Sequence, residues 1–284
     1  MKSYATYLFC LCLACAPAGS SSQAVAPSLP FYDFERQVAP FEMPGRLDEI
    51  SGLAMTGDGR LFGHNDERAT VNEIDPGTGL AGKRFSIGEP PIEGDFEGIA
   101  IAGDRFFLIT SVGLLYEFRE VGDRETAPHR VTDTGLGATC EAEGLDYDAR
   151  EDALLIACKT SSPDRGSIVV QRLPLDASRG RLEPIEISRG QLAAAGLDAG
   201  FQPSSVAVSP VGTLYLASAV TETLIEVDRG GRLLAGEQLD RDRHRQSEGL
   251  AFGPGGTLYI ADEQNRETAR LTLYRAVPAA GQLP

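Results

Sequence analysis

Residues Ser247–Glu263 read SEGLAFGPGGTLYIADE: a short apolar run entered by Ser-Glu-Gly, a Gly-rich turn, a second apolar run and an acidic exit. The same pattern occurs four more times, at Glu49–Glu67, Phe96–Val112, Ala142–Lys159 and Pro203–Ala219. Two short apolar runs joined by a tight turn are typical of a β-hairpin. Five copies of one hairpin therefore predict a repeat protein built from sheets.

The spacing of the copies indicates the class of repeat. The aliphatic anchor residues at one shared position of the five units are Leu53, Ile99, Leu145, Val206 and Leu250. They are 46, 46, 61 and 44 residues apart, close to the about 40 to 50 residues of a four-stranded propeller blade. The sequence thus predicts an all-β, five-bladed β-propeller. A sixth blade would have to lie in the unit of 61 residues, which has too few spare strands.

The two ends of the repeat array predict how the ring closes. The fifth unit reaches a third strand at Leu271–Arg275 and then lacks a fourth. The apolar patch Phe41–Pro44 precedes the first unit, and we expect it to supply the missing strand, because this pairs an otherwise exposed sheet edge. The long third unit carries an insertion in which Gly190–Leu197 predicts a short helix. Residues 39–278 are expected to form a single propeller domain.

Residues 1–24 are predicted to be a targeting segment. Lys2 is the only charge before the almost wholly apolar run Tyr4–Ala16, which is short for a membrane span and is followed by small residues. Leu13-Ala14-Cys15 resembles the end of a bacterial lipobox, which would make Cys15 a lipidation site; ordinary cleavage near Ala18 or Ala24 is the alternative. Residues up to about 38 are predicted to be a tether. We therefore expect export to the periplasm, with membrane contact only through a lipid on Cys15.

Two of the five cysteines lie outside the predicted signal. Cys140 and Cys158 flank the hairpin of the third unit, and an exported compartment permits a disulfide between them. Two free buried thiols are the alternative.

The overall charge bears on partners. The net charge of −15 argues against nucleic acid, since phosphate binding needs a basic face. An acidic surface also keeps a protein soluble, which is the simpler interpretation. We expect a monomer.

Aligning the five units on their anchors places polar side chains around the axis of the ring. One ring contains Ser51, Glu97, Glu143, Ser204 and Glu248. The returning strands end beside it and add further candidates, which are His64, Asp66, Lys159 and Glu263.

Three glutamates around one axis raise one another's pKa, so something must offset their charge. Ca²⁺ held by Glu97, Glu143 and Glu248 is one candidate, because it takes carboxylate and carbonyl oxygens. Lys159 is another. The alternative is that each glutamate caps backbone amides or pairs locally.

Other motifs in the sequence say less about function. GxSxG and HExxH motifs are absent from the sequence. Asp146-Tyr147-Asp148 begins like a calcium loop, but Arg150 and Glu151 occupy the third-ligand and glycine positions. His244 is expected to be a solvated loop residue.

Taken together, the repeated motifs resemble the SdiA-regulated (YjiK-like) family. The resemblance covers residues 40–277 and rests on Ser51-Gly52, Phe96-Glu97-Gly98, Cys140 with Glu143-Gly144-Leu145, Ser204-Ser205, Glu248-Gly249 and Lys159. It implies an exported or membrane-anchored propeller, related to phytase-like and calcium-dependent hydrolase propellers that use carboxylates at the channel mouth. The chain lacks the basic cluster that would hold several phosphates, so phytate hydrolysis is not expected.

Two functions follow from these patterns. The first is an exported propeller that binds Ca²⁺ and a small ligand or protein partner at a carboxylate-lined channel mouth. The alternative is a calcium-dependent hydrolase of esters, lactones or phosphates, with a glutamate, Asp66 or His64 as general base.

Overall fold

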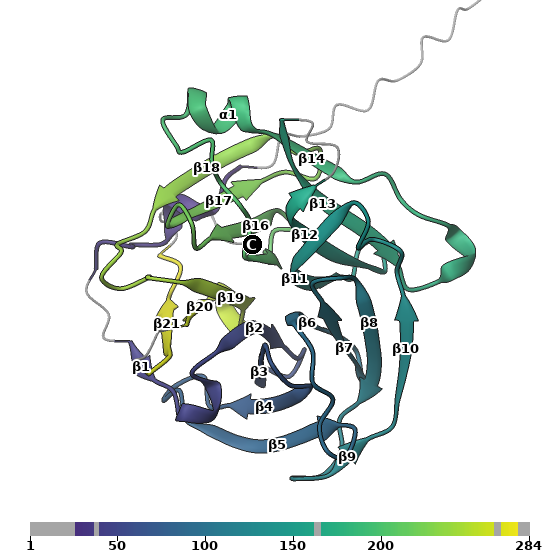
Figure 1. Ribbon diagram of the computed structural model, residues 1–284. Helices are drawn as coiled ribbons and strands as arrows, with labels where there is room; N and C mark the ends of the chain where they lie inside the picture. The colour runs from purple at the N-terminus through teal and green to yellow at the C-terminus, as the bar shows by residue number, and fades with distance from the viewer. Residues whose placement is uncertain (1–25, 37–39, 162–165, 264–267, 278–284) are drawn as a thin grey trace, which may run out of the picture.

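The computed structural model describes residues 26–36, 40–161, 166–263 and 268–277, which form five antiparallel blades around a central axis (Figure 1). The all-β, five-bladed propeller predicted from the repeats is confirmed. In every blade the strand nearest the axis comes from the start of a repeat unit. The fifth blade is completed by a strand from the other end of the chain.

Each blade extends from an inner strand at the axis to an outer strand at the rim. The first consists of β2 (Ile50–Met55), β3 (Leu61–Asn65), β4 (Thr70–Ile74) and β5 (Ala81–Ile87), with the short β9 (Thr126–Ala127) parallel to β5. The second consists of β6 (Phe96–Ala102), β7 (Arg105–Thr110), β8 (Leu114–Arg119) and β10 (His129–Asp133). The third consists of β11 (Cys140–Asp148), β12 (Ala153–Ser161), β13 (Ser167–Pro174) and β14 (Ile185–Ser188). The fourth consists of β15 (Ser205–Val208), β16 (Leu214–Ser218), β17 (Thr223–Val227) and β18 (Leu233–Gln238). The fifth consists of β19 (Ser247–Phe252), β20 (Leu258–Asp262), β21 (Arg270–Tyr274) and β1 (Phe41–Glu42).

The ring closes as the sequence predicts. Phe41 pairs with Leu271 and Glu42 with Arg270, so β1 is the outer strand of the fifth blade. The backbone N–H of Met43 extends this contact by donating to the carbonyl of Ala269 at 2.8 Å.

The segment before β1 differs from the expected tether. The backbone N–H groups of Ser28 and Leu29 each donate to the Glu226 carboxylate at 2.7 Å, at the start of the 3₁₀ helix η1 (Leu29–Phe31). Leu29, Tyr32 and Phe34 are buried against the fourth and fifth blades. Residues 28–34 are therefore a strap that joins two blades. The predicted signal, Cys15 included, lies outside the described residues.

Five clusters of buried hydrophobic side chains hold neighbouring blades together. Each cluster draws its members from two adjacent blades, because both faces of every sheet are covered by a neighbour. Between the first two blades, for example, Phe62 packs edge-on against Phe106 with ring centroids 5.1 Å apart.

Glycines occur where adjacent inner strands approach most closely. A Cβ on Gly98 would lie 2.7 Å from the backbone nitrogen of Leu145, and one on Gly144 would lie 2.9 Å from Cα of Ser205. Backbone atoms cannot move aside as a flexible side chain can. The repeated Glu-Gly and Ser-Gly pairs therefore reflect contact between blades.

The helices are few and short. The insertion in the third unit contains the predicted short helix, α1 (Arg189–Ala194), whose first turn is capped by the Ser188 hydroxyl. The remaining 3₁₀ helices are η2 (Gly45–Leu47), η3 (Ala177–Arg179) and η4 (Pro254–Gly256). None of the helices that the structure describes has the length and apolar character needed to cross a bilayer.

Candidate functional site

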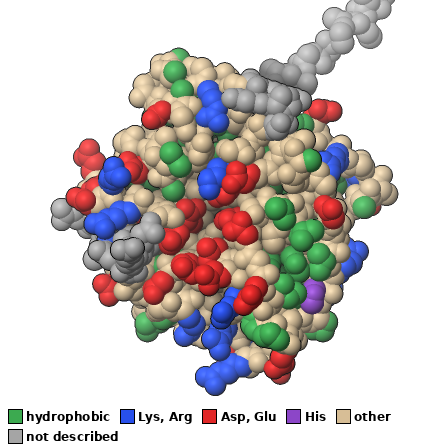
Figure 2. Space-filling model, in the orientation of Figure 1, with side chains coloured by type: hydrophobic (Ala, Val, Ile, Leu, Met, Phe, Trp, Pro, Cys, Tyr) green, Lys and Arg blue, Asp and Glu red, His purple; other side chains and the backbone are tan. Residues whose placement is uncertain are grey.

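Asp and Glu side chains gather over the centre of one face of the propeller, above the ends of the inner strands (Figure 2). We name this site the acidic mouth and define it by the residues Asp66, Glu97, Glu143, Glu248 and Glu263. All five are sequence-predicted site residues.

Backbone irregularities direct the side chains into the acidic mouth. In β6, β11 and β19 the register shifts by one residue at Glu97, Glu143 and Glu248, so each of these is the extra residue of a β-bulge. Ser51 occupies the same position in β2. A bulge re-aims its extra side chain and ends regular pairing, and bulges are common beside functional sites. The ring predicted by alignment is therefore a ring of bulges at these four positions.

A hydrogen bond joins Glu97 to the first blade. Its carboxylate accepts a 3.0 Å hydrogen bond from the Ser51 hydroxyl of the first blade. Burial, and then the negative charge of Glu143, raise the pKa of Glu97 to about 8, against an opposing effect of the Ser51 hydrogen bond. At neutral pH this carboxyl therefore holds its proton for most of the time.

The pKa values of Glu248 and Glu143 are also raised by burial and by neighbouring negative charges. Burial raises the pKa of Glu248 well above its usual range, and Glu143, Glu263 and Glu97 raise it further, in that order. Burial also raises the pKa of Glu143. There Lys159 opposes the shift, because its ammonium lies 2.9 Å from the Glu143 carboxylate.

The acidic mouth continues toward the first blade. Burial raises the pKa of Asp66, with a further contribution from Glu49, and one Asp66 carboxylate oxygen is buried without a hydrogen-bond partner among the described residues. Burial raises the pKa of Glu263 too, followed by the charge of Asp66. Gln246 donates to Glu263 at 2.6 Å. The predicted carboxylates thus form one connected electrostatic group.

Two predicted residues stand apart from this group. The hydroxyl of Ser204 donates to the backbone carbonyl of Ser247 at 2.5 Å, so it fastens β15 to β19. His64 is fully buried, and its Nδ1 donates to the Asn65 carbonyl at 3.1 Å. Burial lowers the pKa of His64 to about 4, which leaves the ring neutral, and its Nε2 has no described partner.

The predicted calcium site can be tested against the side chains present. Carboxylate oxygens suit Ca²⁺ chemically. However, within residues 26–277, as far as they are described, no three His, Cys, Asp or Glu side chains are grouped as metal ligands would be. Glu97 is turned to Ser51 and Glu143 to Lys159. As arranged, the oxygens fit the ion in kind and do not converge on it.

A pocket of about 260 Å³ opens beside the acidic mouth, between the third, fourth and fifth blades. Its polar lining combines both signs of charge with neutral hydrogen-bonding groups and includes Glu143, Lys159, Gln202, Ser204, Arg245, Gln246 and Glu248. The exposed side chain of Val220 lies at the same pocket. This volume is enough for a small polar ligand.

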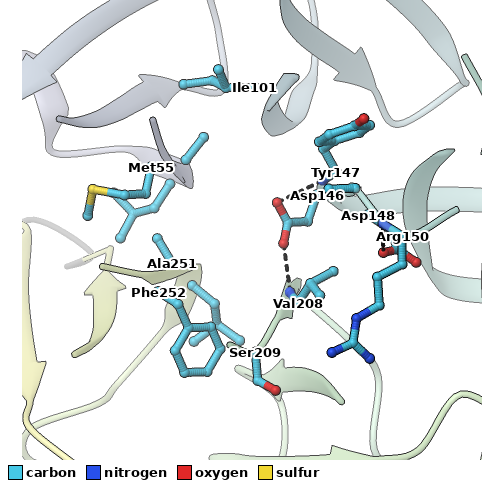
Figure 3. A pocket seen from close by; sticks show the side chains of 14 residues that line it. Met55, Ile101, Asp146, Tyr147, Asp148, Arg150, Val208, Ser209, Ala251 and Phe252 are labelled. Atoms are coloured by element: carbon cyan, nitrogen blue, oxygen red, sulfur yellow. Dashed lines mark hydrogen bonds between the residues drawn. The ribbon is translucent and has the colours of Figure 1, made fainter. Parts of the chain in front are cut away.

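A second pocket of about 330 Å³ lies at the other end of the inner strands (Figure 3). We name it the far mouth; the lining residues used below are Met55, Ile101, Asp146, Val208 and Phe252. None of the sequence-predicted site residues lines it.

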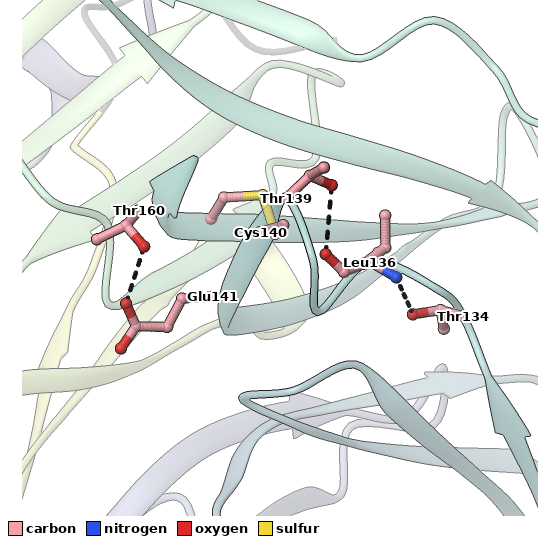
Figure 4. Close-up of a disulfide and its surroundings, with 7 residues drawn as sticks. Thr134, Leu136, Thr139, Cys140, Glu141 and Thr160 are labelled. Carbon is pink, nitrogen blue, oxygen red and sulfur yellow. Dashed lines mark hydrogen bonds between the residues drawn. A yellow bond between two sulfur atoms is a disulfide. The ribbon is translucent and has the colours of Figure 1, made fainter. Parts of the chain in front are cut away.

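Cys140 and Cys158 form a disulfide, with residue positions 18 apart in the chain (Figure 4). The bond ties the start of β11 to β12, the two strands that carry Glu143 and Lys159. It therefore holds the one ion pair of the predicted site residues in place.

Sequence reasoning missed the surroundings of Glu248. His244, expected in solvent, is buried, with Nδ1 2.8 Å from an Asp262 oxygen and Nε2 2.7 Å from the Tyr274 hydroxyl. The Ser247 hydroxyl donates to the other Asp262 oxygen at 2.8 Å. The acidic exit of the repeat, Ala-Asp-Glu, was the available signal, because it places Asp262 opposite Ser247.

Comparison with solved structures supports the fold. A glutaminyl cyclase of Myxococcus xanthus is 16% identical, with 84% of this chain and 95% of that chain covered and a TM-score of 0.59. For a PQQ-bound aldose sugar dehydrogenase of Streptomyces coelicolor the values are 13%, 84%, 97% and 0.53. For a streptogramin B lyase they are 9%, 82%, 96% and 0.52.

No protein-family model and no curated protein sequence matches the chain. At these identities the solved structures have the fold in common with this chain, and their activities do not transfer to it. The comparisons thus place the chain among β-propellers, a fold that several enzymes use.

Proposed function

We propose that this chain is an exported β-propeller, similar to the SdiA-regulated family, that binds a small cationic ligand at the acidic mouth. The ligand is a protonated organic amine or Ca²⁺. The observation that carries the proposal is the gathering of Glu97, Glu143 and Glu248 at bulges around one mouth, where the charge of Glu143 raises the pKa of both Glu97 and Glu248.

A bound cation would relieve this repulsion. Glu97, with a pKa of about 8, is mostly protonated at neutral pH, and a cation favours its ionised form. Binding should therefore release protons and strengthen as the pH rises, as it does for metal sites whose ligands must deprotonate.

The structure favours an organic amine over Ca²⁺ in one respect. An ammonium needs only one or two acceptors in hydrogen-bonding position, whereas Ca²⁺ needs several oxygens at one point. The adjoining pocket of about 260 Å³ can take the rest of a small molecule, with Val220 available to an apolar part.

Two features support export. The disulfide between Cys140 and Cys158 is typical of proteins in oxidising compartments. The apolar run Tyr4–Ala16 has the pattern of a secretory signal.

The test is calorimetric titration of the EDTA-treated protein with CaCl₂ and, separately, with 1,4-diaminobutane, in two buffers of different ionisation enthalpy. We expect one of the two cations to bind with proton release. Glu97→Gln and Glu248→Gln should weaken binding at least tenfold, whereas the exposed Glu183→Gln should bind as the natural protein does. Absence of binding by both cations, or unchanged binding in both acidic-mouth variants, would refute the proposal.

A hydrolase remains the second candidate because of one observation. A carboxyl with a pKa of about 8, 3.0 Å from the Ser51 hydroxyl, lies in the range useful for general acid–base catalysis at neutral pH. A screen of generic esters, lactones and phosphomonoesters tests it, with Glu97→Gln and Glu143→Gln as variants. Hydrolysis that survives both substitutions would exclude the acidic mouth as its active site.

A further inference from the structure

The far mouth contains a carboxylate at a position of the repeat that does not require one. The residue after each anchor is alanine in four units and aspartate in the third, in the order Ala54, Ala100, Asp146, Ala207 and Ala251. Four of five blades therefore form with a methyl group at this position. The Asp146 carboxylate is an addition to the shared architecture.

Hydrophobic side chains from all five blades line the far mouth with Asp146, together with the polar residues Asp148, Arg150 and Ser209. The next position of each inner strand contributes Met55, Ile101, Tyr147, Val208 and Phe252, all of which line the far mouth. In Figure 3 the Asp146 carboxylate lies among these side chains, with Met55, Ala251 and Phe252 across the cavity from it. A cavity of about 330 Å³ that combines apolar side chains with a few polar groups is a typical arrangement for a small-molecule site.

The Asp146 carboxylate has hydrogen-bond donors but no counter-ion. Its two oxygens accept from the backbone N–H groups of Val208 at 2.7 Å and Tyr147 at 2.8 Å. Burial raises its pKa to about 6, so it is largely ionised at neutral pH. No ion pair with Asp146 occurs among the described residues. Of the other charged residues that line the cavity, Asp148 pairs with Arg229, and Arg150 donates to the carbonyl of Val211.

Each carboxylate oxygen can accept a second hydrogen bond, and Asp146 lines the cavity. A protonated amine there would gain a charge-assisted hydrogen bond in a partly dry site. Ca²⁺ is a poor candidate, because the far mouth offers a single free carboxylate. We propose that the far mouth binds a small apolar molecule with one protonated amine, held by Asp146 and packed against Met55, Ile101 and Phe252.

If Asp146 had a purely structural role, it would hold two blades together without binding an amine. By accepting from Val208, Asp146 ties β11 to β15, and this role alone would need no ligand. Asparagine keeps a carbonyl acceptor for that bond but removes the negative charge. The charge and the structural bond can therefore be tested separately.

The experiment compares 2-phenylethylamine with 2-phenylethanol, its uncharged counterpart, by titration at pH 7.5. We expect the natural protein to bind the amine at least tenfold more tightly than the alcohol. Asp146→Asn should reduce the preference to within about twofold, and Met55→Lys, which adds a cation to the cavity wall, should remove amine binding.

Glu183→Gln, at an exposed position that lines neither mouth, is the matched control and should keep the full preference. Glu97→Gln is measured beside it to detect any amine held at the acidic mouth instead. The proposal is overturned if the natural protein binds both probes equally or neither, or if Asp146→Asn keeps the preference. It is also overturned if the preference depends on Glu97, since the amine would then be bound at the acidic mouth. Melting curves of Asp146→Asn and Met55→Lys show that the variants tested are folded.

Discussion

The acidic mouth and the far mouth are the two ends of the same five inner strands, yet their chemistry is opposite. At the acidic mouth, several carboxylates share one site, and the charges of their neighbours add to burial in raising the pKa of Glu97 and Glu248. At the far mouth, the Asp146 carboxylate lies beside hydrophobic side chains from all five blades and has no ion pair among the described residues, whereas Asp148 is paired with Arg229. Charge crowding favours proton uptake at the first site, whereas isolation leaves the second ionised.

The backbone differs between the two ends as well. Glu97, Glu143 and Glu248 are extra residues of β-bulges, whereas Asp146 lies in regular pairing opposite Leu155. The acidic mouth therefore depends on local distortion of the strands, and the far mouth on their regular part. The contrast shows that the repeated fold determines where side chains lie at the two ends of the inner strands. The residues that differ between repeats determine the chemical character of each end.

Loss of the disulfide should have the largest effect, and it should weaken ligand binding at the two mouths to different extents. In the double variant Cys140→Ala/Cys158→Ala, an 18-residue constraint is lost, and the free energy of unfolding should fall by about 3 kcal/mol. Because the bond ties the strands of Glu143 and Lys159, cation binding at the acidic mouth should weaken more than amine binding at the far mouth. Urea unfolding and the two titrations measure this. Equal weakening at both mouths would contradict it.

Gly144→Ala should instead affect both mouths together. The added Cβ would meet the backbone at Ser205, 2.9 Å away, and overpacking of this kind costs about 2 kcal/mol. Urea unfolding measures the loss. Gly57→Ala is the control, since its Cβ would have no neighbour within 4 Å, and it should leave the unfolding free energy nearly unchanged.

Stability should depend on pH mainly through the acidic mouth. The pKa of Glu97 is raised from its usual 4.5 to about 8, so the folded state binds the proton more tightly than the unfolded state. This contribution to stability is complete below pH 4.5 and is lost as the pH rises through about 8. We expect the melting temperature to fall by several degrees over that range. Glu97→Gln should flatten the profile, and a profile identical to that of the natural protein would contradict the assignment.

Asp146→Ala should have the smallest effect. The substitution restores the residue that the other four units carry and removes one acceptor each from the N–H groups of Val208 and Tyr147. We expect a loss of about 1 kcal/mol or less in urea unfolding, because water in the cavity can replace the acceptor. A loss as large as that of Gly144→Ala would show that Asp146 is chiefly a structural bond between blades.

Much of the fold could be predicted from the sequence because the repeat supplies five independent copies of each signal. The hairpins, the blade count and the closing strand at Phe41 all depend on apolar patterns and spacing. The ring of Glu97, Glu143 and Glu248 followed from the same alignment.

Other features have no comparable signal. The bulge at Glu143 has no clear signature in the sequence, because β11 is buried on both faces from Ala142 to Leu145 and shows no strict alternation there. The strap is fixed by contacts from Ser28 and Leu29 to Glu226, far away in the sequence, and its apolar residues follow no period. The burial of His244 likewise depends on Asp262 and Tyr274. These arrangements depend on tertiary contacts that spacing alone cannot supply.

The fifth blade has a bearing on folding. Phe41 pairs with Leu271, 230 positions later, so completing this blade requires segments from both ends of the repeat array to meet. Contacts between distant residues carry the largest loop-closure entropy and slow folding. We expect closure of this blade to be the last step, and amide exchange in β1 and β21 to report opening of the whole ring. On this expectation, the pairing of β1 with β21 limits how fast the ring opens and hence how long the folded protein persists.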